Sequence, residues 1–176
     1  MSKSVLIAGI GNIFNGDDSF GVAVAHRLSS WACPEGVRIV DFGIRALDLA
    51  FAFLDGYDLT ILVDATSQGG APGTLYIIEP NIDGLAGNHA DALVNSHGLD
   101  PVKVLALAKS MGAQFQRILL IGCEPLTVGE EEGGIMKLSE VVDASVDRAA
   151  GMIKELVDEF ERTGEIALYA EAEEGY

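Results

Sequence analysis

Basic residues are scarce in this chain, which has 11 Lys and Arg against 27 Asp and Glu and a formal net charge of −16. Nucleic acids and anionic membrane surfaces bind proteins through clusters of Lys and Arg, so we expect neither as a partner. Cysteine is rare too. Cys33 and Cys123 are too few and too far apart in the sequence for a disulfide scaffold, so we expect two reduced thiols.

Long apolar runs are also missing. No stretch approaches the roughly 20 apolar residues that a membrane-spanning helix needs, so no membrane span is expected. Residues 1–4 lead directly into a short apolar strand, without the apolar core of a signal peptide, and we expect a cytoplasmic protein. The 176 residues, 49% of them hydrophobic, predict a single domain over residues 1–162, followed by an acidic tail over residues 163–176.

Short apolar runs alternate with segments of helical periodicity along the chain. The expected strands are residues 5–8, 37–41, 59–64, 74–78 and 118–122. The turn residues 71–73 (Ala-Pro-Gly) make a short connection between the third and fourth strands, which favours an antiparallel pair. Together these elements predict an α/β fold: a three-layer α/β/α sandwich with a mixed, mainly parallel five-stranded sheet.

Four helices are expected. Asp17 is placed as the N-cap of the first, whose apolar residues recur at helical spacing: Phe20, Val24, Leu28 and Trp31. The second is expected to have one apolar face formed by Leu47, Ala50, Phe51 and Leu54. In the third, Asp100 suits the N-cap and Pro101 the first helical position. The closing helix has an apolar face over residues 138–160.

The loop after the first strand combines glycines with paired acids. It runs from Gly9-Ile10-Gly11-Asn12 to Gly16-Asp17-Asp18. A dinucleotide-binding loop needs a third glycine where this chain has Phe14, and two acids would repel phosphate. In open α/β sheets, ligands bind outside the carboxyl ends of the strands. Acids at this position without a basic partner therefore indicate a cation.

Three side chains are expected to meet at the carboxyl edge of the sheet. Asp18 lies in the first loop, Asp64 ends the third strand, and His97 lies in an irregular loop over residues 81–100, a length that is usually functional. Two carboxylates and an imidazole form an incomplete ligand set for a borderline divalent ion. Taken singly, each residue also fits a structural role, such as a helix-terminal acid, a hydrogen-bonded strand-end acid or a surface histidine.

Other polar residues are weaker candidates. Asp41 ends the second strand and is expected to line the same edge or to hold its loop. His26 is expected to be a solvated or capping side chain of the first helix. His89 shares the loop of His97, where it either orients a ligand or simply adds polarity. The run Glu130-Glu131-Glu132 is typical of a solvated loop.

The stretch from Gly9 to Val22, GIGNIFNGDDSFGV, resembles the amino-terminal motif of the hydrogenase maturation endopeptidases. Residues 62–65 (LVDA) resemble the second motif of that family and residues 96–99 (SHGL) the third. The resemblance extends in order over about residues 5–160. It implies an endopeptidase that removes the C-terminal extension of a NiFe hydrogenase large-subunit precursor after nickel has been inserted.

The same resemblance implies roles for individual residues. Asp18, Asp64 and His97 correspond to the acidic and histidine metal ligands of the family, so they are expected to be both the metal-binding and the catalytic residues. The metal implied is nickel that the precursor already holds. Where the family often has an acid followed by two glycines, this chain has Asp41-Phe42-Gly43, and the role of Asp41 stays open.

Three other functions are compatible with parts of the pattern. A receiver-like phosphoacceptor domain also has acids after its first strand and an Asp closing its third, but here Glu124 and Pro125 follow the last strand where a receiver would offer Lys. A dinucleotide-binding oxidoreductase is disfavoured by the missing glycine and the acidic loop. A metal-sensing binding module of the same fold would use the same residues without cleaving a substrate.

Overall fold

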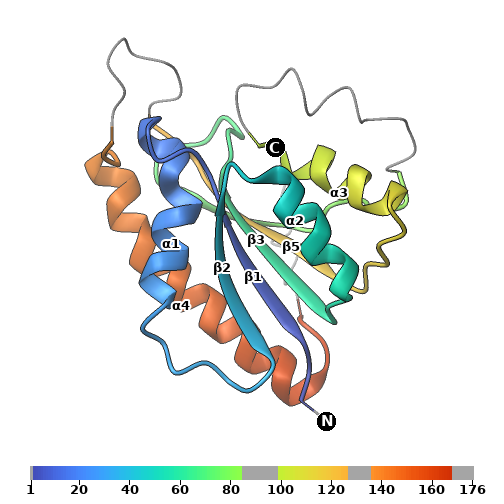
Figure 1. Cartoon of the computed structure of the whole chain (residues 1–176). Helices are drawn as coiled ribbons and strands as arrows, with labels where there is room; N and C mark the ends of the chain where they lie inside the picture. The colour runs from blue at the N-terminus through green and yellow to red at the C-terminus, as the bar shows by residue number, and fades with distance from the viewer. Residues whose placement is uncertain (1, 85–98, 127–135, 168–176) are drawn as a thin grey trace, which may run out of the picture.

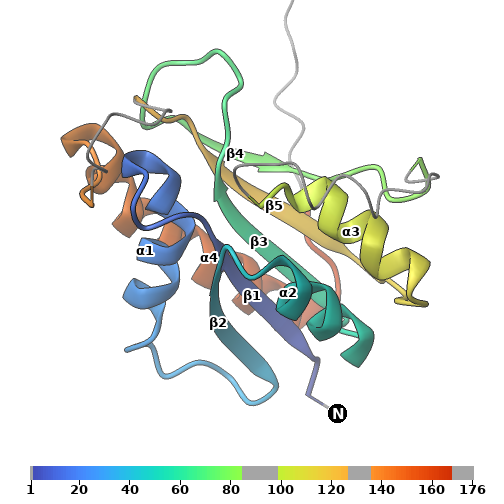
Figure 2. The same ribbon diagram turned by 45° about the horizontal axis from the view of Figure 1, so that its top comes forward.

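The computed structural model describes residues 2–84, 99–126 and 136–167, whose strands form one sheet of five in the order β2-β1-β3-β5-β4. The strands are β1 (Val5–Ile10), β2 (Val37–Gly43), β3 (Leu59–Ala65), β4 (Leu75–Ile78) and β5 (Ile118–Cys123). The pairs β1–β2, β1–β3 and β3–β5 are parallel, and β4 runs antiparallel to β5 at one edge of the sheet (Figure 2). The predicted mixed, mainly parallel sheet is confirmed.

Helices cover both faces of this sheet. They are α1 (Phe20–Leu28), α2 (Ala46–Ala52), α3 (Pro101–Ser110) and α4 (Glu140–Thr163), with short 3₁₀ turns at Gly16–Ser19 and Phe53–Asp55. Figure 1 shows α1 and α4 on one face and α2 and α3 on the other. Side chains of β1 alternate between two buried clusters, with Ile7 packing on the α1/α4 side and Leu6 on the α2/α3 side. The predicted three-layer sandwich is therefore confirmed.

The predicted start of one helix is confirmed and that of another is wrong. The Asp100 carboxylate accepts a hydrogen bond from the Val102 amide at 3.0 Å, and Pro101 opens α3 as expected. Asp17 is not an N-cap, because residues 16–19 form a 3₁₀ turn and α1 begins at Phe20, after Ser19. The physical reason is that the Asp17 side chain is fully buried and accepts a hydrogen bond from the distant Ser139 amide.

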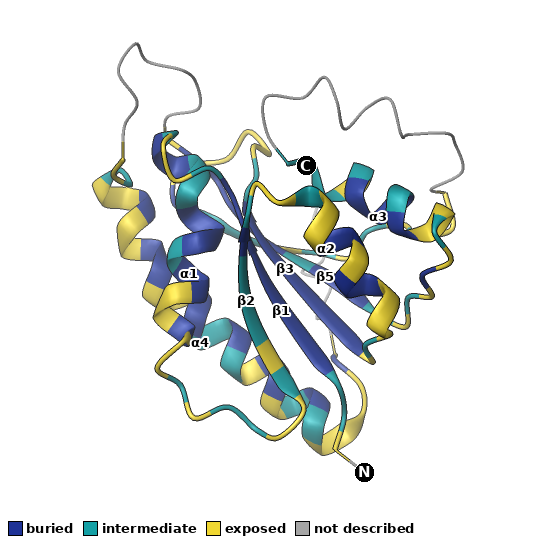
Figure 3. Ribbon diagram, viewed as in Figure 1, coloured by how far each residue is buried: buried dark blue, intermediate teal, exposed yellow. Residues whose placement is uncertain are grey.

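The apolar face predicted for α2 is wrong for three of its four residues and right for Ala50. Leu49 and Ala50 are buried against the sheet, whereas Leu47, Phe51 and Leu54 are exposed. Figure 3 shows this exposed surface along the outward side of α2. Helical periodicity alone could not show which side of α2 is buried, because this short helix has apolar residues at helical spacing on both of its sides.

Two glycines allow close contacts around β1 and α1. Gly11 has φ +143°, and a Cβ at this position would lie 1.8 Å from the Asp18 carbonyl oxygen. Only glycine therefore allows the loop to fold back tightly enough to bring Asp18 to the end of β1. At Gly21 a Cβ would lie 2.0 Å from the carbonyl oxygen of Val63, so α1 packs directly against the backbone of β3.

Both cysteines are free thiols, as predicted. Cys123 is buried, and burial raises the pKa of its thiol to about 11, which keeps the sulfur protonated and unreactive at neutral pH. Among residues 2–84, 99–126 and 136–167, no helix is both long enough and apolar enough to span a bilayer.

Candidate active site

Asp18 and Asp64 lie together at the carboxyl edge of the sheet. Asp64 stands near the end of β3, opposite Gly122 of β5, and is 8% exposed. Burial, and then the negative charge of Asp18, raise the pKa of Asp64 well above its usual range, and the amide of Ala65 opposes this shift. The 3₁₀ turn that carries Asp18 contacts β3, which places the two acids at the same edge of the sheet.

Asp18 is held in place by its own loop. The Asn12 amide donates a hydrogen bond to Asp18 Oδ2 at 3.1 Å, and the Asn15 side chain bonds the same carboxylate. Burial raises the pKa of Asp18, and these two hydrogen bonds lower it in part. The two carboxylates thus share a desolvated edge at which a positive ion would remove the electrostatic cost of both.

The third expected ligand, His97, lies outside the described residues. So do His89, the Glu130-Glu131-Glu132 run and residues 168–176 of the predicted acidic tail. Within the part of the chain that the structure describes, no three His, Cys, Asp or Glu side chains form a group able to hold a metal. The described site is therefore a pair of carboxylates, whose oxygens are suitable donors for a divalent ion with further ligands supplied from elsewhere.

Asp41 pairs with a histidine on α1. His26 Nε2 lies 2.9 Å from Asp41 Oδ2, and the His26 side chain is 68% exposed, so the expectation of a solvated histidine holds. Asp41 lies beside Gly9 in the sheet, and the register then shifts so that Gly43 pairs with Ile10. Phe42 is the extra residue of this bulge and is buried on the α2/α3 side of the sheet.

Glu124 was not identified as a candidate from the sequence. It follows β5 directly, and its carboxylate accepts hydrogen bonds from the Gln68 amide at 2.7 Å, the Gly69 amide at 3.3 Å and the Tyr76 hydroxyl at 2.8 Å. These bonds, the one from Gln68 foremost, lower the pKa of Glu124. Glu124 therefore fixes the loop that leaves β3 just after Asp64. The sequence feature that could have identified Glu124 as a candidate is its position directly after a buried strand.

Asp17 has a structural role that the sequence did not indicate. Its Oδ1 accepts a hydrogen bond from the Ser139 amide at 2.7 Å, and its Oδ2 accepts bonds from the Ser139 hydroxyl and the Leu126 amide, both at 2.9 Å. Leu126 follows β5, and Ser139 is the N-cap residue of α4. Asp17 therefore joins the loop that carries Asp18 to two other segments at the same end of the sheet.

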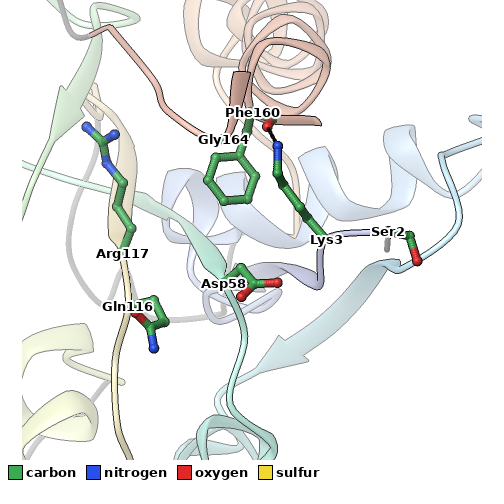
Figure 4. A pocket seen from close by; sticks show the side chains of 7 residues that line it. All are labelled: Ser2, Lys3, Asp58, Gln116, Arg117, Phe160 and Gly164. Atoms are coloured by element: carbon green, nitrogen blue, oxygen red, sulfur yellow. Dashed lines mark hydrogen bonds between the residues drawn. The ribbon is translucent and has the colours of Figure 1, made fainter. Parts of the chain in front are cut away.

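A separate pocket of about 570 Å³ lies at the opposite end of the sheet, where β1 begins (Figure 4). Its charged side chains already have partners: Lys3 donates to the Phe160 and Glu161 carbonyl oxygens at the end of α4, and Asp58 accepts bonds from the Ser4 amide and hydroxyl. These contacts fasten the N-terminal segment to the rest of the fold. The pocket is therefore not the candidate active site, which lies at the carboxyl edge as in other open α/β sheets.

Comparison with known proteins gives one consistent result. Residues 22–156 match the family described as hydrogenase maturation protease. The chain is 34% identical over 157 residues to the hydrogenase expression/formation protein HupD of Rhodobacter capsulatus, covering 88% of this chain and 71% of that protein. It is also 34% identical over 160 residues to HoxM of Azotobacter vinelandii, covering 90% of this chain and 74% of that protein.

Solved structures agree with these relatives. The crystal structure of a hydrogenase 2 maturation peptidase from a Thaumarchaeota archaeon is 30% identical and superposes with a TM-score of 0.67, covering 89% of this chain and 99% of that one. The crystal structure of the NiFe hydrogenase maturation protease HycI from Thermococcus kodakarensis is 33% identical, with a TM-score of 0.63, and covers 89% of this chain and 94% of that one.

Proposed function

Because this chain belongs to the hydrogenase maturation protease family, we propose that it removes the C-terminal extension of a NiFe hydrogenase large-subunit precursor once nickel has been inserted. The observation that carries this proposal is the match of residues 22–156 to that family, and the acids Asp18 and Asp64 at the carboxyl edge of the sheet are the side chains that would act. Family membership favours this endopeptidase over the receiver-like domain and the dinucleotide-binding enzyme.

In this proposal, Asp18, Asp64 and His97 contact nickel that the precursor carries into the site. Bound there, the ion would polarise the scissile carbonyl and lower the pKa of an attacking water. Asp18, positioned by the Asn12 amide, binds the ion through its carboxylate. Asp64 supplies the second carboxylate, which can bind the ion or accept the proton of the water.

Cleavage should depend on the nickel content of the precursor. We expect purified protein to process nickel-loaded precursor at least about tenfold faster than nickel-free precursor, since the metal completes a site that the protein only half supplies. Loss of the extension, followed by mass spectrometry, measures the rates. Equal cleavage of both forms would contradict nickel gating but not the protease activity. Binding of nickel-loaded precursor without any cleavage would favour a metal-sensing module.

The role of His97 can be tested against a neighbour in the sequence. We expect His97→Ala to lower the rate of precursor cleavage by about a hundredfold or more, because loss of an outer-shell residue alone costs about 10–100-fold and a direct ligand should cost more. His89→Ala is the matched control, since it removes an imidazole at a nearby position in the sequence, and it should keep most of the activity. Full activity of His97→Ala would exclude His97 from the site.

A further inference from the structure

Four large apolar side chains lie exposed on α2 and the segments that flank it. Ile44, Leu47, Phe51 and Leu54 are 59%, 54%, 52% and 43% exposed. Leu47 and Phe51 lie four residues apart on one side of α2, Ile44 lies just before the helix and Leu54 in the 3₁₀ turn after it, and Figure 3 shows the exposed outward side of α2. We name these four residues the α2 surface. The opposite side of the helix, with Leu49, already packs in the core, so the fold does not need the α2 surface for its own stability.

The α2 surface is continuous with the candidate active site. The Gly11 amide donates a hydrogen bond to the Gly43 carbonyl oxygen at 3.0 Å, which joins the loop after β1 to the segment that enters α2. Ile13 and Phe14 follow Gly11 and are 44% and 59% exposed, and Ile44 follows Gly43. A protein that reaches Asp18 must approach this same loop, and its body can then extend over α2.

The charges around α2 are nearly balanced, although the chain as a whole is strongly acidic. Residues 37–57 contain two arginines and three aspartates, compared with a net charge of −16 for the whole sequence. Arg45 lies 3.7 Å from Asp48, and Arg38 lies 3.5 Å from Asp55. This side of the molecule therefore offers apolar contact with little net charge around it, which suits a partner patch whose rim is neutral or weakly basic.

We propose that the α2 surface docks the folded body of the substrate precursor. The precursor would present to it an apolar patch with a neutral or basic rim. This inference rests on the proposed function. Four half-exposed side chains offer on the order of 400 Å², about half of the roughly 800 Å² that each partner buries in a stable complex. A substrate that also covers the active-site edge supplies the missing area. A second copy of this chain would contribute only its own α2 surface, and two chains that each carry a net charge of −16 would repel one another.

The test compares the wild type with the double variant Leu47→Asp/Phe51→Asp. Interferometry on immobilised, nickel-loaded precursor should show affinity lower by about 30-fold or more, as expected when two central apolar residues of an interface are replaced by charges. Val141→Asp, an equally drastic change at a 40%-exposed apolar residue on α4, should stay within about twofold. The cleavage rate at saturating precursor should be unchanged in both variants, and circular dichroism should confirm that both are folded.

The possible outcomes separate this docking site from the proposed function. Equal affinity of wild type and double variant for the precursor would overturn the docking site, whether or not cleavage occurs. If the wild type binds precursor without cleaving it and the double variant does not bind, the docking site stands and the protease proposal fails. Self-association that the double variant abolishes while precursor binding is unchanged would assign the surface to a second copy and overturn the proposal.

Discussion

The Asp64→Asn variant is expected to lose precursor cleavage by about a thousandfold or more and yet to be more stable than the wild type. Asparagine keeps an oxygen that can accept the bond from the Ala65 amide, but it has no charge to bind a metal or accept a proton. It also removes a carboxylate that is almost fully buried beside Asp18. We expect a gain of about 0.5–2 kcal/mol, the usual range for relieving such a destabilised site.

The gain should depend on pH in a defined direction. Because the pKa of Asp64 is raised in the folded protein, the folded state keeps this proton at pH values where the unfolded chain has released it. The stability of the wild type therefore falls as the pH rises from about 3.8, the ordinary value, through the raised pKa. The difference between Asp64→Asn and wild type should vanish near pH 3–4 and be largest at neutral pH and above, as measured by thermal unfolding at several pH values.

Asp58→Asn is the matched control for this prediction. The pKa of Asp58 is shifted in the opposite direction to that of Asp64, because the Ser4 amide and hydroxyl stabilise the charge of Asp58 and lower its pKa. Its contribution to stability is present above its ordinary pKa and is lost as the pH falls, so Asp58→Asn should lower the unfolding temperature at neutral pH or leave it unchanged. If Asp64→Asn unfolds at a lower temperature than wild type at pH 7, the electrostatic account of the site is wrong.

Structural features that depend on residues close together in the sequence, or on the direction of the strands, could be predicted. The apolar run from Val5 predicts a strand buried on both faces, and β1 is buried along its whole length. Asp100 and Pro101 specify the start of α3 through one side chain and one fixed φ angle. The meeting of Asp18 and Asp64 could be predicted too, because parallel strands bring their carboxyl ends to one edge.

Features set by distant partners could not be predicted. Leu126 and Ser139 donate hydrogen bonds to Asp17 from 109 and 122 positions away in the sequence, and nothing near Asp17 reveals them. Its place after a glycine loop is equally typical of an N-cap, which was the wrong expectation. The buried side of α2 was mistaken for a similar reason, because contact with the sheet selects Leu49 over Phe51 although both fit the helical period.

The Asp17→Asn variant is therefore expected to be much less stable than the wild type. An amide NH₂ would replace one carboxylate oxygen and face the Ser139 amide, or the Ser139 hydroxyl and the Leu126 amide, all of which donate to Asp17. Unsatisfied buried donors cost about 1–3 kcal/mol each, so we expect a loss of about 3 kcal/mol. Thermal unfolding should then occur roughly 6–12 °C below the wild type.

Asp18→Asn makes the same chemical change one residue further along and should have the opposite effect on stability. Asp18 is only partly buried, and its burial raises its pKa, so removing its charge should not destabilise the fold at neutral pH. Both variants should lose cleavage, Asp18→Asn through the chemistry and Asp17→Asn through displacement of the loop that positions Asp18. Unfolding temperatures that fall equally in the two variants would contradict this division, in which Asp17 holds the edge of the sheet together and Asp18 acts there.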